Sequence, residues 1–148
     1  MIRSSLLILA SLCFGFSGLA AAEPAGTQSE ILATYVRISA ALAADNLADA
    51  KAAATVLADT AGMAKDKAVA DQAAAVAKAA DIASARESFK ALSTTVEPLA
   101  TGEKAYAVMY CPMAKADWVQ MAGGVKNPYY GKSMLTCGTP KEASKASP

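Results

Sequence analysis

Large apolar side chains recur at helical spacing through the first two thirds of the chain. Two strong stripes step by three or four residues, which places each on one face of a helix. They run through Ile31, Tyr35, Ile38 and Leu42, and through Ile82, Ala85, Phe89, Leu92, Val96 and Leu99. Two weaker stripes lie between them, Leu47-Ala50-Ala54-Leu57 and Val69-Gln72-Val76-Ala79. The pattern predicts four helices whose apolar faces meet in a core.

The ends of these helices are expected at residues that favour helix termini. The predicted N-terminal caps are Ser29 for the first helix, Asp45 or Asn46 for the second and Asp81 for the fourth. Gly62 is the predicted end of the second helix. Ala, the best helix former, fills 26 positions between residues 23 and 100. Four helices with short connections predict a mainly α fold, an antiparallel four-helix bundle over residues 29–100.

Residues 101–138 carry a different pattern, rich in aromatic, Gly and sulfur-containing residues. The run from 106 to 110 predicts a strand. The run NPYYG at 127–131 predicts a turn, because Pro fixes φ and Gly accepts a positive φ. We expect this small strand and loop segment to complete a single domain over residues 23–138. Residues 139–148 are polar, lack large apolar groups and predict a disordered tail.

The N-terminal segment, positions 1–22, has the pattern of a secretory signal peptide. Arg3 supplies the positive charge, Leu6–Phe16 the short apolar run, and Ala20-Ala21-Ala22 the small-residue cleavage site. Cys13 is an alternative point of lipid attachment, although the bulky Leu12 precedes it. Cleavage after Ala22 predicts a periplasmic or secreted protein that keeps no membrane segment.

Composition argues against several classes of function. The chain has no His, which rules out a Ser-His-Asp triad, a zinc site built on His and a c-type haem ligand. Cys111 has no second Cys at C-x-x-C spacing either, so we do not expect an enzyme. A formal net charge of +1 gives no field that attracts polyanions, so nucleic acid is not an expected partner.

The sulfur-containing residues form two pairs. Cys111 and Met113 are separated by a single position, so an extended chain points both side chains to one side. Met134 and Cys137 stand at i and i+3, so a single turn brings them together. Thiolates and thioethers without His or clustered carboxylates are soft ligands, which suit Cu(I) or Ag(I). We therefore expect a periplasmic soft-metal-binding protein that uses these four residues as ligands.

Two further groups fit such an ion. Two thiolates around one monovalent cation leave a net negative site, which nearby lysines can offset. These are Lys104, Lys115, Lys126 and Lys132. Trp118 is a candidate to cover the ion through a cation–π contact.

A disulfide is the rival interpretation of the two cysteines. Cys111 and Cys137 are distant in sequence, and the signal peptide predicts an oxidising compartment. Closing a loop of that size stabilises a fold by roughly 3–4 kcal/mol. The chain is then a disulfide-stapled, non-enzymatic interaction module of the cell envelope. Oxidation of the pair also removes both thiolate ligands, so the two interpretations remain compatible as a redox switch.

The run YCPMAKADWVQ…VKNPYYGKSMLTCG resembles the motif of an uncharacterised family of exported bacterial domains. In that family a Cys-Pro-Met element precedes a Trp, an Asn-Pro-Tyr-Tyr-Gly run and Met-Leu-x-Cys-Gly. The helical half is similar too, with ALAADNLADAKAAA and DIASARESFKALS, so the resemblance spans about residues 29–138. Such domains also occur fused to periplasmic adaptors of copper/silver efflux pumps. The resemblance implies heavy-metal handling, an efflux adaptor as partner, and ligands at Cys111, Met113, Met134 and Cys137.

Overall fold

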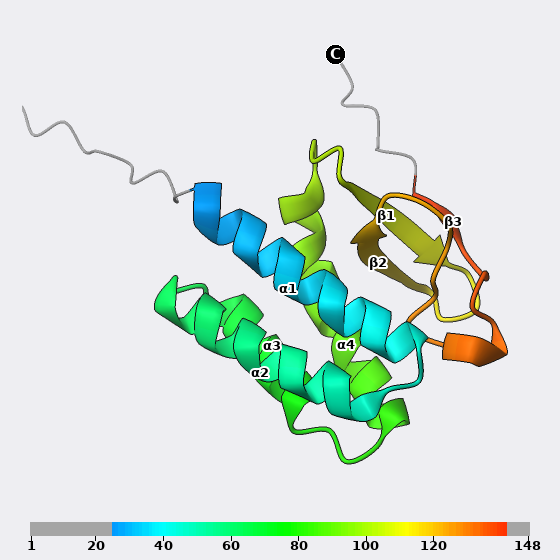
Figure 1. The fold of residues 1–148 in the computed structure, drawn as a ribbon, viewed down its shortest axis with the longest axis horizontal. Helices are drawn as coiled ribbons and strands as arrows, with labels where there is room; N and C mark the ends of the chain where they lie inside the picture. Colours follow the sequence, from blue (N-terminus) through cyan, green and yellow to red (C-terminus); the bar gives the residue numbers. More distant parts are fainter. Residues whose placement is uncertain (1–24, 142–148) are drawn as a thin grey trace, which may run out of the picture.

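Four α-helices form the N-terminal two thirds of the fold (Figure 1). They are α1 (Ala25–Ala43), α2 (Leu47–Met63), α3 (Lys67–Ala77) and α4 (Ile82–Val96), and α4 continues as the 3-10 helix η1 (Glu97–Ala100). The computed structural model describes residues 25–141. The predicted signal peptide, the alternative lipid site at Cys13 and residues 142–148 of the predicted tail lie outside the described residues. None of the helices within 25–141 is long and apolar enough to span a membrane.

Three of the helix starts have side-chain caps. Asn46 accepts a hydrogen bond from the Asp49 amide at 3.1 Å, as predicted for α2. Asp81 and Ser84 form a reciprocal capping box on α4, and Asp66 caps α3. The cap predicted at Ser29 is wrong, because α1 already begins at Ala25 and Ser29 lies inside it. The helix therefore extends past the first polar residue that local preference marks as a boundary.

The helix end predicted at Gly62 is slightly early, because α2 runs through Met63. The chain reverses instead at Lys65, which has a φ of 64°. The preceding reversal, between α1 and α2, uses Asp45 with a φ of 60°. Short polar side chains such as that of Asp tolerate this left-handed conformation better than branched ones do. Both inter-helix corners are thus formed without glycine at the left-handed position.

The predicted apolar stripes form the core. Ile31, Tyr35, Ile38 and Leu42 are all buried, as are most residues of the α4 stripe. Ile82 and Leu99, at the ends of that stripe, are half-buried. The two weaker stripes are likewise buried apart from the half-buried Leu47 and Gln72. Helical periodicity therefore identifies the core-facing residues of all four helices correctly.

The helices pack against one another in chain order, α1 on α2, α2 on α3 and α3 on α4. Direct contact between α1 and α4 is sparse, and the sheet packs against both of them. Figure 1 shows the strands on one side of α1 and α4, with α2 and α3 on the other side. A mainly helical fold with a small C-terminal strand segment is confirmed. The antiparallel four-helix bundle is not confirmed, because part of its expected α1–α4 contact is replaced by sheet.

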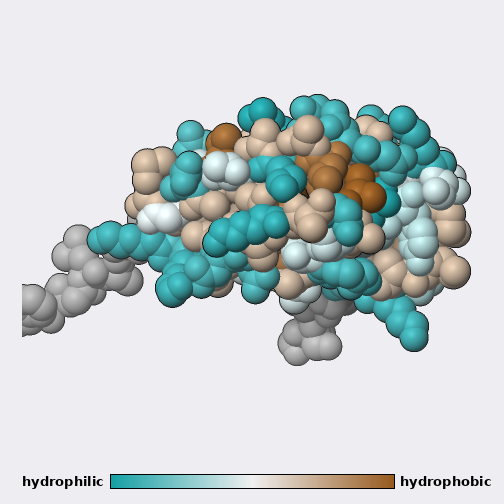
Figure 2. Space-filling view, turned by 90° about the horizontal axis from the view of Figure 1, so that it is seen from below, coloured by the Kyte–Doolittle hydropathy of each residue, from teal (hydrophilic) through white to brown (hydrophobic). Residues whose placement is uncertain are grey.

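The outer face of the α2 and α3 side is a solvated surface. In Figure 2, which views the molecule from that side, hydrophilic side chains alternate with pale, weakly hydrophobic ones, and strongly hydrophobic atoms gather only in small patches. Exposed Ala accounts for this appearance, since Ala is abundant in both helices and adds little apolar area per residue.

The C-terminal strands form a three-stranded antiparallel sheet in the order β2-β1-β3. β1 (Tyr106–Cys111) confirms the predicted strand, and β2 (Ala116–Met121) pairs with it from Tyr106↔Met121 to Cys111↔Ala116. A 3-10 turn, η2 (Gly131–Ser133), follows the predicted turn at 127–131. The short β3 (Thr139–Pro140) closes the other edge of β1.

The described fold continues beyond the predicted domain end at residue 138. The Lys141 amide donates to the Val108 carbonyl oxygen at 2.9 Å. Its Nζ lies 2.7 Å from Glu97 Oε1 and 2.9 Å from Asp117 Oδ2. Composition predicts that residues 139–141 belong to the tail. These residues are instead attached to the domain, because they pair with β1 and because Lys141 contacts two carboxylates.

Two buried tyrosine hydroxyls cover the outer edge of β2. The Val119 amide donates to the Tyr35 hydroxyl at 3.3 Å, and the Tyr129 hydroxyl donates to the Asp117 carbonyl oxygen. Both hydroxyls also contact Ser93 Oγ, at 2.7 and 3.2 Å. Burial raises the pKa of both phenols, so they remain neutral hydrogen-bonding groups. An edge strand is thereby anchored to α1 and α4 through side chains.

A charged network joins α4 to the α1–α2 corner and to the C-terminal loop. Arg86 in α4 donates to the Leu42 carbonyl oxygen at 3.0 Å and to the Pro128 carbonyl oxygen at 2.9 Å. Its Nη2 also lies 2.6 Å from Asp45 Oδ1. Asp45 Oδ2 in turn accepts the Lys132 amide at 3.1 Å. One guanidinium therefore holds three separate segments of the chain together.

The acid stability of the fold is expected to depend on Asp45. The side-chain hydrogen bond from Arg86, followed by that of the Lys132 amide, lowers the pKa of this carboxyl. Its contribution to stability is fully present above the unfolded pKa of about 3.9 and is lost as pH falls through the lower folded pKa. Asp45→Asn should therefore unfold at lower urea concentration than wild type at pH 7, and the two midpoints should converge as pH falls through the lowered pKa of Asp45. A gap that stays constant from neutral to acid pH contradicts this assignment.

Candidate metal site

The two cysteines, far apart in sequence, lie side by side. Cys111 is the last residue of β1 and is buried, and Cys137 is half-buried in the turn before β3. Both are free thiols, and one side-chain amide, that of Asn127, bonds to the sulfur of Cys111 and to the carbonyl oxygen of Cys137. Desolvation, then the hydrogen bond and the charge of Cys111, raise the pKa of the Cys137 thiol above its ordinary value. The convergence of these two residues is the central geometric feature of the site.

Asn127 lies behind the cysteine pair and is fully buried. Its Nδ2 donates to Cys111 Sγ at 3.2 Å and to the Cys137 carbonyl oxygen at 2.6 Å. Its Oδ1 accepts the backbone amides of Tyr129 at 2.8 Å and Tyr130 at 3.3 Å. A second donor, the Ala114 amide, lies 3.4 Å from Cys111 Sγ. The sequence indicated only a turn at Asn127, and its contact with the distant Cys111 sulfur was missed.

The two predicted methionine ligands lie at the surface. Met134 is 37% exposed and directly follows η2, where the Cys137 amide donates to the Met134 carbonyl oxygen at 3.0 Å. The spacing of Met134 and Cys137 thus does form a turn, as predicted. Met113 is 60% exposed. The prediction that it shares one side of an extended strand with Cys111 is wrong, because β1 ends at Cys111 and residues 112–115 form a turn.

Trp118 packs beside the cysteine-bearing turn. It is fully buried in β2, and its Nε1 donates to Gln120 Oε1 at 3.1 Å. Gly138, which follows Cys137, has a φ of 146°, and a Cβ there would collide with the indole ring. The indole thus requires glycine next to Cys137. The cation–π role expected of Trp118 stays a prediction.

The charge-balancing role expected of four lysines stays a prediction. All four lysines are exposed, at positions 104, 115, 126 and 132. Within residues 25–141 no group of three or more His, Cys, Asp or Glu side chains could hold a metal ion. Among the described residues, the cysteine pair therefore has no third His, Cys, Asp or Glu beside it.

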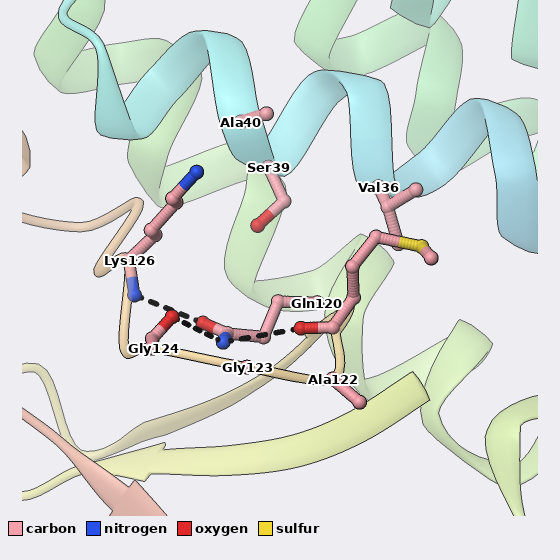
Figure 3. A pocket seen from close by; sticks show the side chains of 9 residues that line it. Val36, Ser39, Ala40, Gln120, Ala122, Gly123, Gly124 and Lys126 are labelled. Carbon is pink, nitrogen blue, oxygen red and sulfur yellow. Dashed lines mark hydrogen bonds between the residues drawn. The ribbon is translucent and has the colours of Figure 1, made fainter. Parts of the chain in front are cut away.

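A small pocket of about 170 Å³ lies between α1 and the segment that follows β2 (Figure 3). Val36, Ser39 and Ala40 form its α1 wall, and Gly123 and Gly124 lie opposite. The floor is Gln120, whose Oε1 accepts the Lys126 amide at 3.0 Å and whose Nε2 donates to the Gly124 carbonyl oxygen at 3.0 Å. Because the same Oε1 accepts Trp118 Nε1, this residue links the pocket wall to the indole.

Comparison with known proteins gives a family but no activity. The chain matches DUF3347, described as a protein of unknown function, over residues 31–106. This range runs from α1 to the first residue of β1, so both cysteines lie beyond it. No curated protein and no solved structure matches the chain. The match agrees with the expected uncharacterised domain family, whereas the Cys/Met motif and the fusion to efflux adaptors stay predictions. Because the match spans more than half of the sequence, the chain belongs to the DUF3347 family.

Proposed function

We propose that the protein binds a soft monovalent metal ion, Cu(I) or Ag(I), between Cys111 and Cys137. The observation that carries the proposal is the adjacency of two free cysteines from segments far apart in the sequence, both bonded to the same Asn127 amide. Thiolates are the preferred ligands of such ions, and the described residues offer no His or carboxylate cluster that would favour a harder one. Both thiols must lose their protons on binding, so binding should weaken as pH falls.

Hydrogen-bond donors of the protein surround the sulfur of Cys111. Two N–H groups, Asn127 Nδ2 and the Ala114 amide, are directed at its sulfur. Hydrogen bonds from N–H donors to an ionised acceptor are stronger than those to a neutral one. Met113 and Met134 flank the two cysteines in sequence and are both exposed, and we assign them as additional thioether ligands. The site then serves metal handling in the periplasm or outside the cell, in association with an efflux adaptor.

The same adjacency favours a second candidate function. In an oxidising compartment the two thiols can lose two protons and two electrons to an external oxidant and form a disulfide. The chain is then a stapled interaction module, and the exposed apolar side chains of Met113, Met134 and Leu135 are available to contact a partner. Intact mass of protein isolated from its native compartment separates the two candidates, since a disulfide without metal reduces the mass by two hydrogens.

Titration of the reduced protein with Cu(I) against a chromogenic chelator tests the metal proposal. Wild type should bind one ion, and Cys111→Ser and Cys137→Ser should each weaken binding by more than about 100-fold, because removing a ligand exceeds the usual cost of removing one of its supporting contacts. Met121→Leu is the matched control, since Met121 is an exposed sulfur residue outside the proposed set. Cysteine variants that bind as tightly as wild type overturn the proposal.

A further inference from the structure

Asn127 occupies a position that constrains the cysteine pair in two ways. It is 0% exposed, and its side chain makes four hydrogen bonds to four different residues. The two amides of Tyr129 and Tyr130 hold its Oδ1, so its Nδ2 is fixed toward Cys111 Sγ and the Cys137 carbonyl oxygen. The backbone of Asn127 is tied as well, donating to the Leu135 carbonyl oxygen at 2.7 Å and accepting the Gly131 amide at 3.1 Å.

The first consequence concerns geometry. One amide group bonds to the sulfur of Cys111 and to the backbone of Cys137, so it links the end of β1 to the turn before β3. Outer contacts of this kind orient metal ligands before the metal arrives, and their loss usually costs about 10- to 100-fold in affinity. Since neither cysteine is restrained by a disulfide, the amide is a principal polar link between them.

The second consequence concerns the choice of metal. An amide NH₂ group has donors and no lone pair available for a cation, so the group nearest Cys111 Sγ cannot serve as a ligand. Its oxygen faces away toward the two tyrosine amides. Zn(II) and similar divalent ions need three or four protein ligands, whereas the described residues offer no third His, Cys, Asp or Glu at the pair. A carboxylate at this one position would supply the missing ligand.

We propose that Asn127 is the specificity-determining residue of the cysteine pair, which it holds in place for a monovalent soft ion while its amide nitrogen occupies the position of a third ligand. This inference rests on the proposed function. It extends that function by assigning the discrimination between Cu(I) and divalent ions to one buried side chain.

Asn127→Asp tests both parts, because an aspartate keeps the acceptor for the two tyrosine amides and replaces the NH₂ donor with an oxygen ligand. In parallel titrations of the reduced protein, Cu(I) affinity should fall by about 10- to 100-fold, and tight Zn(II) binding should appear. Asn127→Ala should lose Cu(I) affinity to the same degree and gain no Zn(II) binding. Asn46→Asp is the matched control, since it makes the same exchange at the exposed cap of α2 and should change neither metal.

The outcomes separate the two proposals. A wild-type protein that fails to bind Cu(I) overturns the proposed function and this inference with it. If wild type binds Cu(I), and both Asn127 variants are folded by circular dichroism and bind Cu(I) as tightly as wild type, only the inference fails. It also fails if Asn127→Asp loses Cu(I) affinity without gaining Zn(II). Should Asn127→Asp not fold, a Cu(I) affinity of Asn127→Ala equal to that of wild type overturns the inference, and a loss of about 10- to 100-fold supports it.

Discussion

Replacing Trp118 with Ala is expected to lower the free energy of unfolding by about 3–5 kcal/mol, the usual cost of truncating a fully buried aromatic side chain. Trp118 is the largest fully buried side chain among the described residues. Its ring packs perpendicular to that of Tyr129, with centroids 6.0 Å apart, and its Nε1 bonds to Gln120. The truncation therefore leaves a cavity and a buried acceptor without one of its donors.

Urea unfolding monitored by far-UV circular dichroism measures this effect, because Trp118 is the single Trp of the chain and its fluorescence disappears in the variant. Met121→Ala, an exposed truncation in the same strand, should stay within about 0.5 kcal/mol of wild type. A Trp118→Ala protein as stable as that control would mean that the indole is not the packing centre of the C-terminal segment.

Gly131→Ala is expected to cost about 2–4 kcal/mol, from left-handed strain together with displacement of an ion pair. Gly131 has a φ of 54°, and a Cβ there would collide with the side chains of Asp45 and Arg86. Neither charged group can move aside without breaking contacts, since Arg86 also donates to the Leu42 and Pro128 carbonyl oxygens. The methyl group therefore disrupts the junction between helices and loop.

Gly62→Ala is expected to raise the free energy of unfolding, in contrast to Gly131→Ala. Gly62 lies in the last turn of α2, and a Cβ there would meet no atom within 4 Å. Replacing glycine with alanine inside a helix stabilises it by about 0.5–1 kcal/mol. Chemical denaturation of the two variants should thus shift the unfolding midpoint in opposite directions. Equal effects would show that the crowding at Gly131 does not govern stability.

The helical half could be predicted from sequence because its determinants are local. The spacing of Tyr35 or Phe89 within its stripe already fixes which face is buried, and Asp81 caps a helix that starts at the next residue. Ser29 shows where this logic fails, since a residue typical of helix starts also occurs inside a helix whose capping is decided elsewhere. The β2 segment has no alternating pattern, and its residues from Trp118 to Gln120 are buried consecutively.

For the candidate site, the sequence indicates residue types but not how they are arranged. Sequence named Cys111 and Cys137 but left their pairing open, because the contact depends on how the loop between β2 and β3 folds back. The NPYYG run predicts a turn at Asn127, but nothing in it reveals that the side-chain amide of Asn127 bonds to Cys111 at the end of β1. The two-residue spacing predicts that Met113 lies on the same side of an extended chain as Cys111. The chain instead turns from Pro112 onward, so this spacing does not apply.

The two phenols along β2 also bear on self-association. A sheet grows by recruiting another chain onto free N–H and C=O groups at its margin. On the β2 side the amide of Val119 and the carbonyl of Asp117 are already engaged by Tyr35 and Tyr129. If a further strand were added to this sheet, we would therefore expect it at the opposite edge, where β1 is covered only by the two-residue strand β3.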